Sequence, residues 1–438
     1  MFKLQLHWQI LIALILAVIA GLVTGTEVGV FGITFFAMYD FVGELFLNAL
    51  KMLIVPLVMS SIITGIAGIG STSALGRLGG LTLLMYLVTG LLAVLVGLMF
   101  INLISPGIVD GEPARDILGL TADKAAAAAE RIEGRGAGDI ADVFLSMLPQ
   151  NVIAAAAEGQ LLGLITFSLL FGYFMTRIQA PLAEHLWQLW QGIFQVMMKI
   201  TDLVMKFAPL GVFALVAKVV AGIDADEFGG LVQSVGLFFV SVMLGLLVHS
   251  LITLPALLVL VARVNPWRHF RAVATPVLTA FSTASSSATL PLTMEAVEKN
   301  AGVSNRISSF VLPLGATVNM NGTALYECAA AMFIAQAYGL ELTFTTQFTV
   351  VLIALLTSIG VAGIPAASLV AITIILAAIG LPLEAIGVIL AVDRILDMFR
   401  TAVNVFGDTV AAVVVARLEG EEGILEPQPP CAESAVAG

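Results

Sequence analysis

Hydrophobic residues run along almost the whole chain in stretches long enough to cross a lipid bilayer. A span of the hydrocarbon core needs about 20 apolar residues in a helix, and lipid leaves the backbone few alternatives. The pattern predicts eight spans, at residues 8–25, 42–66, 80–104, 141–176, 188–221, 229–262, 308–338 and 383–416. We therefore predict an all-α polytopic membrane protein, whose first hydrophobic run is a retained helix and not a cleaved signal peptide.

Two further apolar stretches, at residues 272–294 and 346–379, are each interrupted near the middle. The first carries TAFSTASSSATLPLT and the second SIGVAGIP, and the arms on either side have about 10 to 15 residues, too few to cross. Small residues and glycine allow a tight turn that is buried in protein. The pattern predicts two re-entrant helical hairpins, the first entering from the cytoplasmic side and the second from outside. Ordinary broken core helices are the alternative.

Each predicted hairpin is followed by a span that polar residues interrupt. A hairpin and span in one orientation, then a hairpin and span in the opposite orientation, form an inverted repeat. Such repeats place substrate and ion sites at their interface near mid-membrane. We therefore expect a transport site in the last third of the chain.

Composition agrees with a membrane protein and excludes an ordinary soluble globule. Of the 438 residues, 59% are hydrophobic and 11% are charged, and the mean hydropathy is +1.05. The net charge of -11 argues against a nucleic-acid partner. Lys and Arg gather on one side of the predicted spans, so the positive-inside rule places both termini in the cytoplasm, with the protein in the cell (plasma or inner) membrane.

The last predicted span carries a stripe of polar and charged side chains. Its members recur at three- and four-residue spacing and so share one face of a helix: Asp393, Asp397, Arg400, Thr401, Asn404 and Asp408. Each charge at mid-membrane costs about 2.5 to 3.5 kcal/mol when it faces lipid. The stripe must therefore face protein, ligand or water. Asp–Arg pairing that only holds the helix in its bundle is one interpretation; a binding site for a charged ligand is the one that we favour.

Two other segments carry candidate chemistry. Ser285, Ser286 and Ser287 at the first hairpin tip are nucleophiles or hydrogen-bond donors, but the histidines lie at termini, in loops or on a distant helix, which favours binding over hydrolysis. In GATVNMNGTALY, residues 315–326, glycine and amides inside an apolar span predict local unwinding. Unwinding frees carbonyls for a hard cation such as sodium. Helix packing is the alternative for this cluster.

Four motifs, SSSATLP, LPLGATVNMNGTALYE, SIGVAGIPAAS and DRILDMFRTAVNVFGD, together resemble the glutamate transporter family, the excitatory amino acid transporter-like dicarboxylate/amino acid:cation symporters. The resemblance covers essentially the whole chain. It implies a homotrimer with an elevator mechanism, in which a transport domain slides across the membrane against a scaffold. The implied division is 1–78, scaffold helices 1 and 2; 79–104, transport-domain helix 3; 105–140, extracytoplasmic loop; 141–221, scaffold helices 4 and 5; 222–416, transport-domain core with helices 6 to 8 and both hairpins; and 417–438, disordered cytoplasmic tail.

The resemblance also implies roles in the substrate pocket. Arg400 clamps the side-chain carboxylate of an acidic amino acid, for which its planar fork is independently suited. Asp397 takes the ammonium, and Asn404 takes the α-carboxylate. The full implied substrate set is Ser286, Ser287, Thr323, Val361, Gly363, Asp397, Arg400, Thr401 and Asn404.

Sodium sites follow from the same resemblance. The first uses Gly315, Asn319, the Asn404 carbonyl and Asp408, and the second uses backbone oxygens of Thr317, Ser358, Ile359 and Val361. The third sodium site of the family is altered in this sequence. Asn321 replaces an aspartate, and Gly90, beside Tyr86 and Thr89, replaces a serine. We expect this third site to bind sodium weakly or not at all, or to be linked to protons. Fewer than three sodium ions would then accompany each substrate.

A further departure concerns an arginine that the family places just before the three serines or two residues before the substrate arginine. Those positions hold Ala284 and Met398, which bears on potassium countertransport and gate coupling; Arg394 is a candidate substitute.

The sequence thus predicts a secondary active symporter, and not an enzyme, that imports glutamate or aspartate with sodium, protons or both. A C4-dicarboxylate:cation symporter is the alternative, disfavoured because Asp397 beside Arg400 suits an ammonium as well as a carboxylate. A neutral amino acid transporter or a channel is less favoured. A channel predicts a polar lining through several spans, whereas the polarity here is confined to the last third.

Overall fold

The structure is a computed structural model, and it describes residues 6–67, 75–115, 117–118, 145, 147–158, 161–222, 228–340, 343–358, 368, 371–372, 375–376, 379, 381–382 and 385–425. Over these residues the chain is mostly helical, as predicted. Two small antiparallel ribbons modify the all-α prediction: β1 (Gly29–Val30) pairs with β2 (Ile33–Thr34), and β3 (Ile108–Val109) pairs with β4 (Glu112–Pro113). Both lie in turns after helices, where the reversing chain pairs its own backbone groups.

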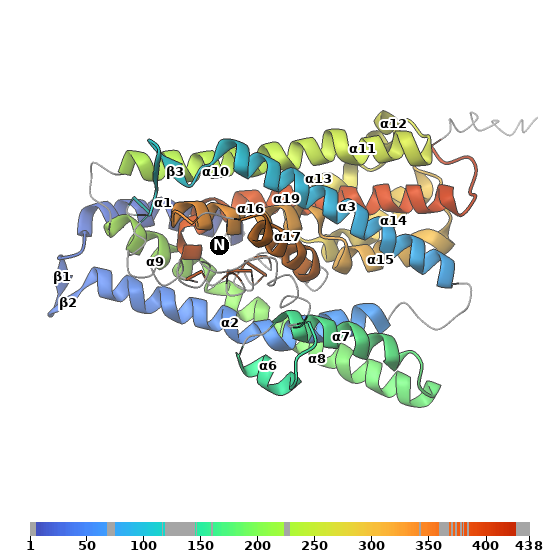
Figure 1. The fold of residues 1–438 in the computed structure, drawn as a ribbon, viewed down its shortest axis with the longest axis horizontal. Coiled ribbons are helices and arrows are strands. Elements are labelled where there is room, and N and C mark those ends of the chain that lie inside the picture. Colours follow the sequence, from blue (N-terminus) through green and yellow to red (C-terminus); the bar gives the residue numbers. More distant parts are fainter. Residues whose placement is uncertain are drawn as a thin grey trace, which may run out of the picture.

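The described helices pack in two groups (Figure 1). The first group is α1 (Leu6–Thr24), α2 (Phe35–Ala67), α6 (Val152–Glu158), α7 (Leu161–Met175), α8 (Ala180–Lys206) and α9 (Ala208–Ala221). The second group is α3 (Leu75–Ile104), α10 (Phe228–Val248), α11 (Leu254–Leu257), α12 (Pro266–Ala272), α13 (Ala274–Thr283), α14 (Ser286–Lys299), α15 (Asn305–Val318), α16 (Asn321–Ala337), α17 (Phe344–Ser358) and α19 (Ile386–Leu418). The groups meet chiefly where α9 packs against α19.

Several helices are apolar and long enough for a membrane protein. Arg77–Ile104, Phe228–Ala262 and Ile386–Leu418 each have the length and composition of a span. The second of these runs without a break because π-helical turns, His249–Thr253 and Leu258–Ala262, flank α11. Another predicted span, 188–221, is bent by 55° between α8 and α9, where Pro209 stands at the start of α9. Predicted span 141–176 divides into α6 and α7 in its described part.

The predicted interruption of span 308–338 is present. Helix α15 ends at Val318 and α16 begins at Asn321, and the two residues between them have non-helical backbone angles. Asn319 has φ -102° and ψ 72°, and Met320 has φ -99° and ψ 58°. A break of this kind exposes helix-end N–H and C=O groups, which need partners from neighbouring helices or a ligand.

The first predicted hairpin is also present as a pair of short helices. Helices α13 and α14 pack against each other and against α19, and they have 10 and 14 residues, too few to cross a bilayer singly. Ala284 ends α13 with a left-handed φ of 50°, and the side chain of Ser285 caps α14 by accepting from the Ala288 N–H. For the second hairpin, α17 is the first arm, and its tip with Ile359, Val361 and Gly363 lies outside the described residues.

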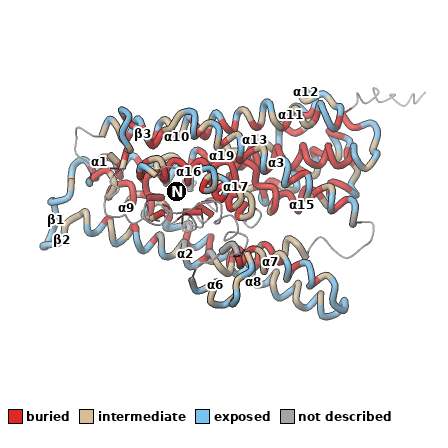
Figure 2. Tube along the Cα trace, viewed as in Figure 1, coloured by how far each residue is buried: buried red, intermediate tan, exposed pale blue. Residues whose placement is uncertain are grey.

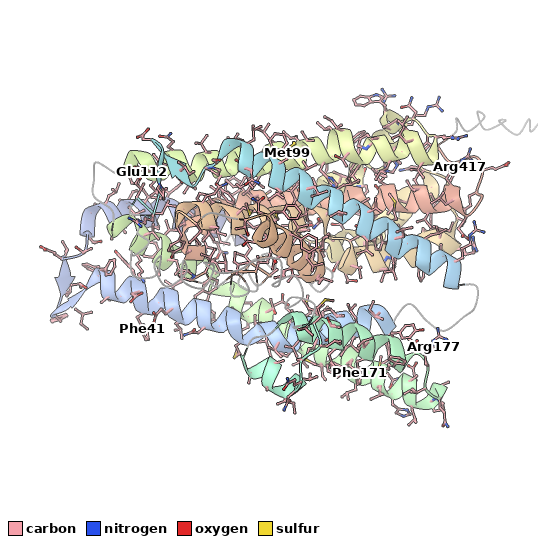
Figure 3. All side chains as sticks on the ribbon, viewed as in Figure 1. Phe41, Met99, Glu112, Phe171, Arg177 and Arg417 are labelled. Carbon is pink, nitrogen blue, oxygen red and sulfur yellow. The ribbon has the colours of Figure 1, made fainter. Side chains whose placement is uncertain are left out.

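Burial and surface composition fit a protein surrounded by lipid. Helices α16 and α19 are buried along almost their whole length, and α2, α3, α8 and α10 carry exposed faces (Figure 2). Large apolar side chains such as Phe41 and Met99, 68% and 50% exposed, lie on the flanks of the molecule. Figure 3 shows Arg177 and Arg417 at one end of the long axis and Glu112 at the other. Exposed apolar side chains along the helices are what a lipid environment favours.

Residues 419–425, which we call the strap, fold back over one end of the second group. The carboxylate of Glu419 pairs with Arg77 of α3 (3.3 Å) and Arg306 of α15 (3.2 Å). The N–H of Leu425 donates to the carbonyl of Ala301 (2.9 Å), just after the first hairpin. Ile424 and Leu425 are buried. The arginines of these ion pairs are largely exposed, so the pairs contribute little. The strap is held by its buried apolar side chains together with the Glu421 carboxylate, which accepts from the Ser304 N–H (3.0 Å).

Removing the strap is expected to destabilise the fold. Deleting residues 419–438 exposes the apolar surface that Ile424 and Leu425 cover, and burying each of those side chains is worth about 1.5 to 3 kcal/mol. The midpoint of thermal unfolding of the purified protein in detergent should therefore fall. The matched control is deletion of residues 426–438 alone, which keeps the strap and should leave the midpoint unchanged. Equal midpoints for the two deletions would contradict this role.

Candidate functional site

The charged side chains of α19 form one buried network. Arg400 donates from Nη2 to Asp393 Oδ1 (3.1 Å) and to Asp397 Oδ1 (2.9 Å). Arg394 donates from Nη1 to Asp397 Oδ2 (3.0 Å). Arg400 is completely buried, and the other three are nearly so. The predicted stripe therefore faces the interior of the protein.

Among the described residues, the ion pairs of this network all join residues of the same helix. They do not tie α19 to its neighbours, which argues against the interpretation in which pairing only holds the helix in its bundle. Within that same part of the chain, Arg400 has unused donors, because its Nε and Nη1 find no hydrogen-bond partner. A buried unpaired donor is costly, so Arg400 is suited to receive an acceptor such as a carboxylate.

Tyr326 of α16 sets the plane of the Arg400 guanidinium. The guanidinium carbon lies 3.8 Å from the centroid of the tyrosine ring. This cation–π contact occupies one face of the guanidinium and leaves its edge for in-plane acceptors. Helix α16 approaches closely because residue 322 is glycine: a Cβ there would lie 2.7 Å from the Arg400 carbonyl oxygen. The sequence pattern did not predict a role for Tyr326. Its position at the end of the polar segment GATVNMNGTALY could have indicated one.

Asn404 joins α19 to the start of α16. Its Oδ1 accepts from the N–H groups of Gly322 (2.8 Å) and Thr323 (3.4 Å), and its Nδ2 donates to Thr323 Oγ1 (3.0 Å). The amide thus satisfies N–H groups that the break before α16 exposes. Asn404 and Thr323 both belong to the predicted substrate set, and in the structure they are hydrogen-bonded to each other. Thr401 bonds back to the Asp397 carbonyl (2.8 Å).

The first hairpin lies beside this network. Phe281 of α13 meets Phe399 of α19 edge to face, with ring centroids 4.9 Å apart. At the hairpin tip Ser286 is buried and Ser287 is exposed. Because α13 and α14 both pack on α19, the tip is held near the Arg400 segment. The predicted serines therefore belong to the same region of the protein as the charged stripe.

Predicted cation ligands from α3, α15 and α19 converge on Asp408. Asn319 donates from Nδ2 to Asp408 Oδ1 (2.9 Å) and accepts from Thr89 through Oδ1 (3.2 Å). Gly315 lies so close that a Cβ there would be 2.5 Å from Asp408 Oδ1 and 3.0 Å from the Tyr86 hydroxyl oxygen. The described residues contain no cluster of three His, Cys, Asp or Glu that could hold a metal ion. A cation here would rely on one carboxylate with amide, hydroxyl and carbonyl oxygens, which suits a hard monovalent ion.

Asn321 borders the same region. A Cβ on Gly407 would lie 2.6 Å from Asn321 Nδ2, and one on Gly90 would lie 3.8 Å from Asn321 Oδ1. Neither side-chain atom of this buried amide has a hydrogen-bond partner in the described part of the chain. The residues of the altered third site, Tyr86, Thr89 and Asn321, thus adjoin those of the first site.

The residues of the second predicted sodium site are only partly described. Ser358 ends α17 and its hydroxyl donates to the Leu355 carbonyl (2.8 Å). Thr317 is near the end of α15, and its hydroxyl donates to the Leu314 carbonyl (3.1 Å). Ile359 and Val361 fall outside the described residues.

Glu327 is a buried carboxyl to which sequence reasoning gave no role. Its Oε2 accepts from Thr357 of α17 (2.9 Å), and Oε1 has no partner among the residues that the structure describes. The signal was available, because Glu327 closes the motif LPLGATVNMNGTALYE and is a lone acid in an apolar span. Asp393, predicted only as a member of the stripe, and Arg394, predicted only as a candidate substitute for a family arginine, prove to be members of the buried network.

A helical bundle with charge buried inside it and an interrupted helix beside that charge defines a membrane transport protein. Comparison with known families agrees: residues 6–418 match the sodium:dicarboxylate symporter family, and the chain belongs to it. The glutamate transporter resemblance of the four motifs is thereby confirmed.

Individual relatives align over nearly the whole chain. The proton/glutamate-aspartate symporter of Escherichia coli (strain K12) is 36% identical over 422 residues, covering 95% of this chain and 93% of the relative. The proton/sodium-glutamate symport protein of Geobacillus stearothermophilus is 32% identical over 428 residues, 96% of each chain. The neutral amino acid transporter B(0) of Homo sapiens is 35% identical over 434 residues, covering 91% of this chain and 78% of the relative.

Proposed function

We propose that the protein is a secondary active symporter that imports glutamate or aspartate together with sodium, protons or both. The observation that carries the proposal is the buried ion pair between Arg400 and Asp397. Within the described structure Arg400 keeps N–H donors that have no partner. An acidic amino acid brings a carboxylate for the first and an ammonium for the second. The glutamate and aspartate symporters among the relatives support this substrate class.

Two other substrate classes fit less well. A C4-dicarboxylate has no ammonium to neutralise Asp397, so it would leave a buried carboxylate facing its own charge. A neutral amino acid has no side-chain carboxylate to bind the Arg400 donors, although one relative is named a neutral amino acid transporter. Hydrolysis lacks support, because neither buried histidine bonds to a hairpin serine among the described residues. His269 bonds to Thr409 (3.0 Å), and neither ring nitrogen of His249 has a partner there.

The test of this function is a competition panel in proteoliposomes. Uptake of labelled aspartate is driven by imposed sodium or proton gradients, and unlabelled glutamate, aspartate, succinate and serine compete. We expect glutamate and aspartate to compete best. Stronger competition by succinate would favour the dicarboxylate alternative, and stronger competition by serine the neutral amino acid alternative.

We also propose that the altered third cation site does not contribute a full sodium ion. Asn321 has no charge to offer where the family has an aspartate, and Gly90 has no hydroxyl. Each coupled charge is worth about 2.3 kcal/mol per 100 mV, so losing one would lower the accumulation that the protein can sustain. Uptake under separately imposed sodium and proton gradients measures the stoichiometry; three sodium ions per substrate would disprove this hypothesis.

Glu327 is the proposed proton-linked group. A buried carboxyl that accepts one hydrogen bond among the described residues is expensive to keep charged, so its proton is expected to enter and leave as the site opens and closes. Replacing Glu327 with Gln should flatten the pH dependence of aspartate uptake. Glu295→Gln, the same change at an exposed residue of α14, is the matched control. An unaltered pH profile in a folded Glu327→Gln protein would remove this residue from proton coupling.

The architecture that goes with this function is an elevator in a homotrimer with eight spans, two re-entrant hairpins and cytoplasmic termini. The separate packing of the α1–α2–α7–α8–α9 group and the group around α19 supports a scaffold and a transport domain. The division at residues 78, 104, 140, 221 and 416 remains a prediction. Crosslinking across the α9–α19 contact tests the elevator mechanism, because a covalent link there should stop one group from sliding against the other.

A further inference from the structure

Arg394 belongs to the buried network, but the proposed substrate contacts do not use it. It lies one turn before Asp397 on α19, and its Nη1 is 3.0 Å from Asp397 Oδ2. The other carboxylate oxygen, Oδ1, accepts from Arg400 at 2.9 Å. Asp397 is therefore held by a different arginine at each of its two oxygens.

Substrate binding can change one of those two contacts and leave the other in place. If Arg400 turns to the side-chain carboxylate of an acidic amino acid and Asp397 turns to its ammonium, the bond between Arg400 and Asp397 weakens. The bond from Arg394 involves the opposite oxygen and can persist. Asp397 then keeps a charged partner throughout, which matters because a buried carboxylate without one is strongly unfavourable.

The net charge of the network also indicates that Arg394 serves substrate binding through Asp397. The network holds two aspartates and two arginines, so its formal charge is zero. Without Arg394 the remaining three residues would carry one net negative charge, and the site would repel an acidic amino acid of the same sign. Arg394 thus makes it possible for an anionic substrate to enter a site that contains two carboxylates.

A purely structural role fits the contacts poorly. The Arg394–Asp397 pair lies within one helix at i, i+3 spacing, so this pair does not join α19 to another element. Pairs of that spacing stabilise a helix only weakly. The Nε of Arg394 has no hydrogen-bond partner among the described residues. The contact that explains why an arginine is buried at position 394 is therefore its ion pair with Asp397.

We propose that Arg394 is a positioning residue for substrate recognition, which holds the Asp397 carboxylate in place and balances its charge while Arg400 binds the substrate. This inference rests on the proposed function, since it assumes that the substrate is an acidic amino acid. Arg394 acts through Asp397 and does not itself contact the substrate.

The test compares aspartate uptake by Arg394→Met, Arg394→Lys and wild-type protein in proteoliposomes. For Arg394→Met we expect KM for aspartate to rise about ten- to a hundredfold, the range of one lost hydrogen bond between charged groups, with little change in maximal rate. Lysine keeps the charge and can reach one oxygen, so Arg394→Lys should recover most of the affinity. The matched control is Arg417→Met on the same helix, whose arginine bonds to the Glu421 carbonyl and whose loss should leave KM unchanged.

The outcomes separate this inference from the proposed function. If wild-type protein fails to take up aspartate, the proposed function is wrong. If wild-type protein takes up aspartate and folded Arg394→Met has an unchanged KM, the role of Arg394 is wrong. A lower maximal rate at unchanged KM, or a lysine variant no better than the methionine variant, would also overturn it. Thermal unfolding of each purified variant in detergent establishes that it is folded.

Discussion

Replacing Arg400 with serine is expected to abolish the uptake of acidic amino acids. The change removes the donors for the side-chain carboxylate, and hydrogen bonds to charged groups contribute about 1.5 to 3 kcal/mol each. It also leaves Asp393 and Asp397 without their shared cation, and losing one partner of a buried pair costs about 3 to 5 kcal/mol. Affinity for aspartate should therefore fall by a factor of about a hundred or more.

The same variant is expected to accept serine-like substrates, because Asp397 and Asn404 remain while the clamp for a second carboxylate is gone. Uptake of labelled aspartate and labelled serine, measured side by side in proteoliposomes, checks both parts. Arg417→Ser, the same change at the C-terminal end of α19, is the matched control and should transport aspartate normally. Undiminished aspartate transport by Arg400→Ser would refute the assignment of Arg400.

Replacing Asp408 with asparagine is expected to remove most of the sodium dependence. Asp408 accepts a hydrogen bond from Asn319, lies directly against Gly315 and is 3% exposed. A unit charge about 4 Å from a cation is worth about 4 kcal/mol at an effective dielectric constant near 20. The half-saturating sodium concentration for aspartate uptake should therefore rise at least about a hundredfold.

Asparagine preserves the size of the side chain, so the variant tests charge more than packing. Its matched control is Asp202→Asn, on α8, where the side chain is 64% exposed and makes only a 4.0 Å pair with Lys199 among the described residues. Sodium dependence is measured by varying external sodium at constant ionic strength. An unchanged half-saturating concentration in the Asp408 variant would show that this carboxylate is not a sodium ligand.

The local pattern was sufficient to locate two irregular parts of the described fold. The break at Asn319 and Met320 and the turn at Ala284 and Ser285 both fall where small and polar residues interrupt apolar runs. In lipid every backbone group must find a partner inside the protein, so a run of apolar residues predicts helix and its interruption predicts an end.

Helix ends beyond the apolar region were less well predicted. Helix α8 begins at Ala180 and not at residue 188, and α2 begins at Phe35 and not at residue 42. The added turns contain polar residues, including Glu184 and His185 in α8, that the hydrophobic pattern assigns to loops. A helix continues into water while its backbone bonds persist, because solvent does not penalise polar side chains.

The class of protein, the buried stripe on the last helix and the residues that line it followed from the amino-acid pattern, because the cost of placing charge in lipid restricts where those residues can face. Their partners came from the packing of the helices. The pairing of Asp397 with two arginines, the use of Asn404 at the start of α16, and the contact of Glu327 with Thr357 depend on rotamers and on helices distant in sequence. Spacing along one helix specifies a shared face, whereas the packing of several helices selects which atoms on that face meet.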